Sequence, residues 1–220
     1  VMLLEYYFEQ QRHYENIYGP DTVVLLMKGT FYEAYATDEV GKAAEVAQLL
    51  NFVLTKANKK LPEVSVQNPY MTGIPACSVK KHIEVLVKNM YTVVLIDQDP
   101  KDPTKRTVSG ICSPGTMCTT AETPDTRPVC CIYAESTPDG PVFGVSVIDL
   151  AIGRCTYAEV TRGLTNRRLE DAFLLIELYN PVEVIHVYES TGLIEQCKQL
   201  HCSPKTHTKI ADAVDKDVRY

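Results

Sequence analysis

The feature that most constrains this chain is a break in its hydrophobic pattern between residues 113 and 128. This stretch contains three prolines and six serines or threonines, and it follows neither the period of a helix nor that of a strand. Periodic segments lie on both sides of it, as expected of two domains joined by a linker. We therefore predict a first domain at 1–113, a linker at 114–127 and a second domain at 128–220. A chain of 220 residues is long enough for each to bury a core.

The first domain alternates helical and strand patterns, which predicts a mixed-sheet α/β domain. Helical spacing of apolar residues occurs at 2–16, 38–51 and 78–89. Strand patterns occur at 23–27, 31–35, 52–55, 91–97 and 106–112. A proline-bearing loop is expected over 62–75, and a surface hairpin over 99–105. The expected buried stripe of the middle helix consists of Val40, Ala44, Ala47 and Leu50, and Asn51 is the expected stop.

The second domain starts with a run of strands and continues with alternating helices and strands. The three leading strands are predicted at 129–135, 142–149 and 154–160. The later elements are predicted as a helix at 166–179, a strand at 182–188, a helix at 193–200 and a last strand at 206–210. This order predicts a three-layer α/β domain of the ribonuclease-H type.

The formal net charge of −6 argues against a protein that binds nucleic-acid phosphates over a wide surface. The charge is uneven, however. Residues 1–113 carry 12 Lys/Arg against 13 Asp/Glu, whereas residues 114–220 carry 10 against 15. The first domain is therefore the better candidate for contact with nucleic acid.

Other composition features predict a soluble intracellular protein with reduced thiols. Apolar runs stop at four or five residues, far short of the ~20 that cross a bilayer. The nearest approach to a metal-ligand cluster among the eight cysteines consists of Cys197, His201, Cys202 and His207. Because no Cys-x-x-Cys pair accompanies it, buried reduced thiols are favoured over zinc. The chain starts at Val1 rather than Met, so we expect a piece of a longer protein.

The candidate functional site is the segment Gly29-Thr30-Phe31-Tyr32-Glu33. Alternation along a strand places Phe31 and Glu33 on one side, about 6–7 Å apart, and Tyr32 on the other. Two interpretations are open: Phe31 packs in the core with Glu33 solvated, or Phe31 is a wedge beside a hydrogen-bonding carboxyl. The residue types alone favour the first interpretation.

Motifs along the rest of the chain favour the second interpretation. Residues 29–35, Gly-Thr-Phe-Tyr-Glu-Ala-Tyr, resemble the Gly-Asp-Phe-Tyr-Glu-x-Phe stretch of the MutS family of DNA mismatch-repair proteins. Further similarity lies in Leu54-Thr55-Lys56, Met71-Thr72-Gly73-Ile74-Pro75, the strand 91–98, Ser113-Pro114-Gly115-Thr116 and residues 148–154. Each motif is weak alone, but their order along nearly the whole chain is specific.

The resemblance implies a mismatch-recognition domain followed by a connector domain. In that family the Phe wedges from the minor groove against a mispaired base and the Glu hydrogen-bonds to it, which assigns these roles to Phe31 and Glu33. The implied partner is double-stranded DNA with mismatches or small loops, bound by a homo- or heterodimer of the full-length protein, without a membrane. No Gly-x-x-x-x-Gly-Lys-Ser/Thr sequence occurs here. We therefore expect no enzyme activity, cofactor or metal in this chain, and ATP and Mg²⁺ in the full-length protein.

Four lysines are candidates for contact with the DNA backbone. Three of them, Lys56, Lys59 and Lys60, lie in the basic turn at 56–60, and Lys28 lies next to the segment 29–33. The alternative is that all four are solvated surface residues. One departure from the family pattern is Thr30, where the family usually has Asp. It removes a negative charge near the DNA and puts in doubt any hydrogen bond that this Asp makes.

Two alternatives come from other classes. A metal-dependent nuclease of ribonuclease-H-like fold would need several carboxylates, and Asp149, Glu135 and Glu183 are the acids placed on the relevant strands, without a signature spacing. A structural homologue that has lost mismatch sensing is the other alternative, and the presence of both Phe31 and Glu33 argues against it.

Overall fold

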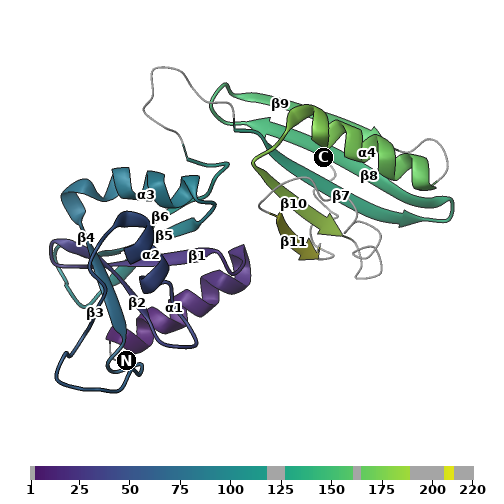
Figure 1. The fold of residues 1–220 in the computed structure, drawn as a ribbon. Helices are drawn as coiled ribbons and strands as arrows, with labels where there is room; N and C mark the ends of the chain where they lie inside the picture. The colour runs from purple at the N-terminus through teal and green to yellow at the C-terminus, as the bar shows by residue number, and fades with distance from the viewer. Residues whose placement is uncertain (1–2, 118–126, 161–164, 189–205, 211–220) are drawn as a thin grey trace. The chain divides into compact units, whose positions relative to one another are not determined.

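The computed structural model describes residues 3–117, 127–160, 165–188 and 206–210 (Figure 1). The chain divides into two compact units, Val1–Met117 and Cys118–Tyr220. Most of the linker predicted at 114–127 lies outside the described residues. None of the described helices is both long and apolar enough to cross a membrane.

Unit 1 is a six-stranded mixed sheet with helices on both faces. Its described strands are β1 (Thr22–Lys28), β2 (Phe31–Ala36), β3 (Thr55–Lys56), β4 (Tyr70–Pro75), β5 (Thr92–Gln98) and β6 (Arg106–Cys112), in the spatial order β3-β4-β2-β1-β5-β6. Its described helices are α1 (Leu3–Tyr18), α2 (Ala43–Leu50), the short 3-10 turn η1 (Ala76–Ser78) and α3 (Val79–Lys88). β1 and β5 run parallel, and the other neighbouring pairs run antiparallel. The predicted mixed sheet is confirmed.

Alternation along the strands divides the core of unit 1 between the two faces of the sheet. On one face, Tyr7 and Phe8 of α1 pack against residues that include Val24 and Tyr35. On the other face, α2 and α3 pack against residues that include Tyr32 and Val93. Consecutive residues of β2 therefore point to different cores.

The helix predicted at 38–51 is shorter and differently rotated. It begins at Ala43, because residues 36–41 instead form a tight loop in which the Thr37 amide donates to the Val40 carbonyl. The predicted buried stripe is right in part: Ala47 is buried and Leu50 packs against the core, but Ala43 and Val46 are buried whereas Ala44 is exposed. The predicted stop is confirmed, since Asn51 adopts a left-handed conformation with φ 54° and caps the helix.

The segment 62–75 was predicted as a loop, but its last six residues form β4. This strand pairs along its whole length with β2, from Phe31 opposite Pro75 to Ala36 opposite Tyr70. Proline at its last residue and a glycine in its middle conceal the strand in the sequence, because both are rare inside strands. The short strand predicted at 52–55 is reduced to Thr55–Lys56.

Unit 2 is a five-stranded mixed sheet in the order β11-β10-β7-β8-β9. Its described elements are β7 (Val129–Thr137), β8 (Gly140–Asp149), β9 (Arg154–Val160), α4 (Thr165–Tyr179), β10 (Glu183–Tyr188) and β11 (Thr206–Ile210). β7, β8 and β9 are antiparallel, whereas β10 runs parallel to both β7 and β11. Ala172 and Ile176 of α4 pack on a core that includes Ile132 and Phe143. The helix predicted at 193–200 lies outside the described residues.

Candidate functional site

A two-residue turn between β1 and β2 presents the candidate segment. Lys28 and Phe31 pair across it, with Gly29 and Thr30 as the loop. Gly29 has φ 63° and Thr30 does not have a positive φ, which is the pattern of a type II′ turn and explains glycine at the first loop position. The Gly29 amide donates to Oε1 of Gln98, 3.1 Å away, so β5 also holds the turn.

Phe31 is an apolar ring in contact with solvent. It is 44% exposed at the first residue of β2. Its ring lies over Gly73 of β4, where an added Cβ would sit 3.5 Å from Cδ1. Phe31 is thus a surface residue, although single exposed apolar side chains are common and assign no function by themselves. The interpretation in which Phe31 packs in the core is therefore wrong.

Glu33 has the opposite environment, because its carboxylate is largely withdrawn from solvent. The side chain is only 12% exposed, and Oε2 lies 3.6 Å from Nζ of Lys28. The hydroxyl of Tyr35 donates a hydrogen bond to the same oxygen. Strand alternation puts Phe31, Glu33 and Tyr35 on the α1 face. The site therefore combines an exposed ring with a recessed, partnered carboxylate.

Tyr32 points to the opposite face, as predicted. It is 7% exposed, and its hydroxyl donates to Oδ1 of Asp97 at 2.5 Å. Burial raises the pKa of Tyr32, and the hydrogen bond to Asp97 raises it further, so the hydroxyl remains a donor. Tyr32 therefore anchors β2 from the side away from the site.

Helix α1 supports β2 from the side of the site. The Tyr7 ring meets the Tyr35 ring edge-on, with centroids 4.9 Å apart. The Tyr7 hydroxyl lies 3.3 Å from the Tyr35 carbonyl and 3.1 Å from the Val24 carbonyl. Oε1 of Gln11 accepts a hydrogen bond from the Val24 amide, and Nε2 of Gln11 donates one to the Thr22 carbonyl. These buried contacts fix the strand that carries Glu33, and helical spacing alone did not predict them.

Unit 1, which carries this site, matches a known protein family. A family model described as MutS domain I matches residues 5–121, slightly more than half of the chain. The chain belongs to the MutS family. The matched range contains Phe31, Glu33 and Tyr35, together with every described element of unit 1 except the first two residues of α1.

Curated MutS relatives extend the similarity beyond domain I. A DNA mismatch repair mutS homologue of Acanthamoeba polyphaga mimivirus is 28% identical over 202 residues, covering 86% of this chain and 18% of the relative. The DNA mismatch repair protein MutS of Streptococcus equi is 29% identical over 187 residues, 80% of this chain and 21% of the relative. MutS of Streptococcus mutans is 34% identical over 140 residues, 61% and 15% respectively. The chain thus spans about a fifth of the length of these relatives.

The candidate lysines do not gather at one place in the MutS domain. Lys28 lies beside Glu33 and is 55% exposed. Lys56 lies in β3, two strands away from β2, and its ammonium donates to the carbonyls of Leu61 and Pro62 at 2.9 and 3.2 Å. Lys56 therefore lies in a strand rather than in the predicted turn, and its ammonium closes a loop; its contact with DNA stays a prediction. Lys59 and Lys60 are exposed.

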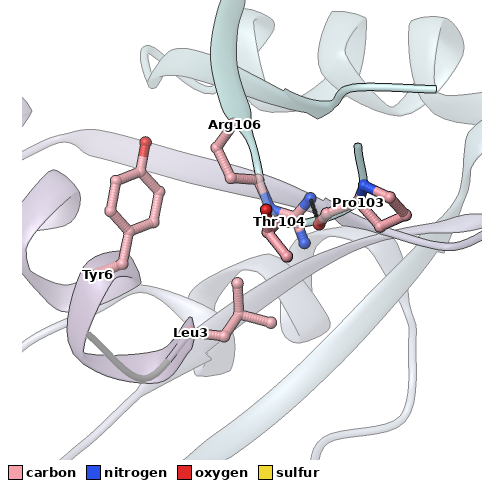
Figure 2. A pocket seen from close by; sticks show the side chains of 5 residues that line it. All are labelled: Leu3, Tyr6, Pro103, Thr104 and Arg106. Atoms are coloured by element: carbon pink, nitrogen blue, oxygen red, sulfur yellow. Dashed lines mark hydrogen bonds between the residues drawn. The ribbon is translucent and has the colours of Figure 1, made fainter. Parts of the chain in front are cut away.

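A surface pocket of about 500 Å³ lies between the start of α1 and the β5–β6 connection (Figure 2). It is lined by Leu3, Tyr6, Pro103, Thr104 and Arg106. Nη1 of Arg106 donates to the Pro103 carbonyl at 2.9 Å, which fixes the guanidinium in the wall. Burial raises the pKa of Tyr6, and the charge of Arg106 opposes this rise. Sequence reasoning missed this pocket, because its two sides are about a hundred residues apart in the chain.

The acids of unit 2 do not form a metal centre in the part of the chain that the structure describes. Oδ1 of Asp149 accepts the amides of Ala151 and Ile152, so this carboxylate closes the β8–β9 turn. Among the described residues, no group of three or more His, Cys, Asp or Glu side chains could hold a metal ion. The cluster of Cys197, His201, Cys202 and His207 lies outside the residues whose side chains are described.

Proposed function

We propose that this chain senses mispaired and unpaired bases in double-stranded DNA, as the N-terminal part of a MutS-type mismatch-repair ATPase. Phe31 enters the duplex from the minor groove as a wedge, and Glu33 hydrogen-bonds to the displaced base. The observation that carries the proposal is the exposed Phe31 ring beside a carboxylate that the protein withdraws from solvent. The match to MutS domain I and the names of the relatives support the same function.

Duplex deformability supplies the discrimination. Inserting an apolar wedge unstacks a base step and kinks the duplex, at a cost of about a few kcal/mol per step. A mispaired or unpaired base has less stacking and pairing to lose, so the cost is smaller there. Because this difference does not depend on the hydrogen-bonding pattern of particular bases, one ring can recognise many kinds of mismatch.

The direct test is binding of the whole protein to three duplexes that differ at one position. Fluorescence anisotropy would compare a homoduplex, a G·T mismatch and a one-base loop at one salt concentration. We expect tighter binding to both defective duplexes. Equal affinity for all three would contradict the proposal.

Replacement of Glu33 by glutamine tests the base contact. The amide keeps the shape of the side chain but removes the negative charge, which the phosphates repel. We expect homoduplex binding to strengthen and the preference for G·T to fall by about tenfold, the effect of about 1.4 kcal/mol. The exposed Glu39, also in unit 1, provides the matched control, because Glu39→Gln removes the same charge elsewhere. An unchanged preference for G·T over homoduplex in Glu33→Gln would rule out this role.

Lysine substitutions test the backbone contacts through the salt dependence of binding. Each lost phosphate contact should flatten the slope of log K against log salt by about one unit. We expect this for Lys59→Ala and Lys60→Ala, whose ammonium groups are exposed. For Lys56→Ala we expect a smaller change in slope and a less stable loop, because its ammonium also donates to the carbonyls of Leu61 and Pro62. The reverse pattern would reassign the DNA contact to Lys56.

We propose that unit 2 is the connector domain of this protein, with a ribonuclease-H-like fold. The support is its strand order, three antiparallel strands followed by two parallel ones, with α4 on one face. ATP and Mg²⁺, and homo- or heterodimer formation, belong to the proposal for the full-length protein. No observation on the described residues favours the metal-dependent nuclease, and it is not proposed.

A further inference from the structure

The hydroxyl of Tyr35 is placed to control the carboxylate of Glu33. Tyr35 is 2% exposed, and its hydroxyl donates to Oε2 of Glu33. Within the described residues, both polar contacts of this carboxylate end at Oε2, one from Tyr35 and one from Lys28. The second oxygen, Oε1, makes no hydrogen bond or ion pair within the described residues.

The two partners of Oε2 differ in how firmly they can hold it. Lys28 is 55% exposed, and its flexible side chain reaches Oε2 only at 3.6 Å. Because the Lys28 ammonium is exposed, water screens its charge and the long side chain must be ordered to form the pair, so the pair contributes little. A buried hydroxyl that donates to a charged acceptor makes a stronger contact. Tyr35 is therefore the group that determines the carboxylate's position.

The position of the hydroxyl is itself fixed by the fold. The Tyr35 ring packs edge-on against Tyr7, and the Tyr7 hydroxyl approaches the Tyr35 carbonyl. Burial raises the pKa of Tyr35, and its hydrogen bond to Glu33 raises it further. The hydroxyl therefore keeps its proton at neutral pH and remains a donor.

We propose that Tyr35 is a positioning residue for mismatch recognition, which holds Oε2 of Glu33 in the protein so that Oε1 faces the base beside Phe31. This inference rests on the proposed function of Glu33. A donor fixed before the ligand arrives removes the need to order the carboxylate during binding. Tyr35 thus acts on the base through Glu33.

The test is Tyr35→Phe, which removes one oxygen atom and keeps the ring. We expect homoduplex affinity to stay within about twofold and the preference of the whole protein for G·T over homoduplex to fall by about tenfold, the effect of about 1.4 kcal/mol. Because both duplexes titrate one preparation, this ratio does not depend on the fraction of folded protein. Tyr32→Phe is the matched control, since it removes a hydroxyl that also donates to a carboxylate, but on the other face of the sheet. It should leave the preference within about twofold of the unsubstituted protein.

A double substitution separates positioning from a merely structural role. In a Glu33→Ala background, Tyr35→Phe should have no further effect on mismatch preference, because the group it positions is gone. The same loss in both backgrounds, or an equal loss for both duplexes, would overturn the inference. If Tyr35→Phe, Phe31→Ala and Glu33→Gln all left the mismatch preference intact, the proposed function itself would fail. Loss in those two variants but not in Tyr35→Phe would reject only the role of Tyr35.

Discussion

Replacing Phe31 with alanine should abolish the preference for mismatched DNA and leave weak binding to any duplex. An aromatic ring stacked on a base contributes about 1–3 kcal/mol. Since 1.4 kcal/mol is tenfold in affinity, the G·T complex should weaken by about 5- to 140-fold. Homoduplex binding should change little, because it depends on phosphate contacts that alanine does not remove.

The same substitution should barely affect the fold. Phe31 is 44% exposed and lies at the first residue of β2, so truncation leaves no enclosed cavity. The free energy of unfolding should change by no more than about 1 kcal/mol. Tyr157→Ala is a suitable control, because that ring is 84% exposed and lies in unit 2. A mismatch preference that survives Phe31→Ala would remove Phe31 from the mechanism.

Periodicity predicted the elements whose burial is uniform along one face. Helix α3 lies within the helix predicted at 78–89 and buries Ile83, Leu86 and Val87, and the β7–β9 run follows the predicted strands. It failed for β4, whose pairing depends on β2 rather than on its own alternation. The rotation of α2 was also missed, because alanines on both sides give a weak stripe. Contacts distant in the chain determine these two elements.

The candidate site was only partly predictable. Strand alternation placed Phe31 and Glu33 on one side and Tyr32 on the other, as the structure has them. The same alternation puts Tyr35 beside Glu33, so a signal for their hydrogen bond was present in the sequence. The exposure of Phe31 was not predictable from residue types, because an aromatic residue in a strand usually packs in a core.

Replacing Gly41 with alanine should destabilise unit 1 strongly, although it adds only one methyl group. Gly41 has φ 99°, and an added Cβ would lie 2.1 Å from the Tyr35 carbonyl oxygen and 2.8 Å from the Ala36 Cα. Both are backbone atoms of β2. Tyr35 pairs with Met71 of β4 and Ala36 with Tyr70, and Ala36 also bridges to Gly41, so neither atom can move cheaply. The clash adds to the conformational cost of a positive φ. We expect a loss of at least about 3 kcal/mol, a large part of a typical stability of about 5–15 kcal/mol.

Gly29→Ala separates the two causes of this loss. Gly29 also has a positive φ, 63°, but an added Cβ would meet no atom within 4 Å. It should cost only about 1–2 kcal/mol, the conformational term alone. Urea unfolding of both variants, followed by far-UV circular dichroism, would measure the difference as a shift in midpoint at constant slope. Equal shifts would mean that the end of β2 moves away from residue 41 without strain, and that the backbone at Tyr35 is less rigid than its pairing with β4 requires.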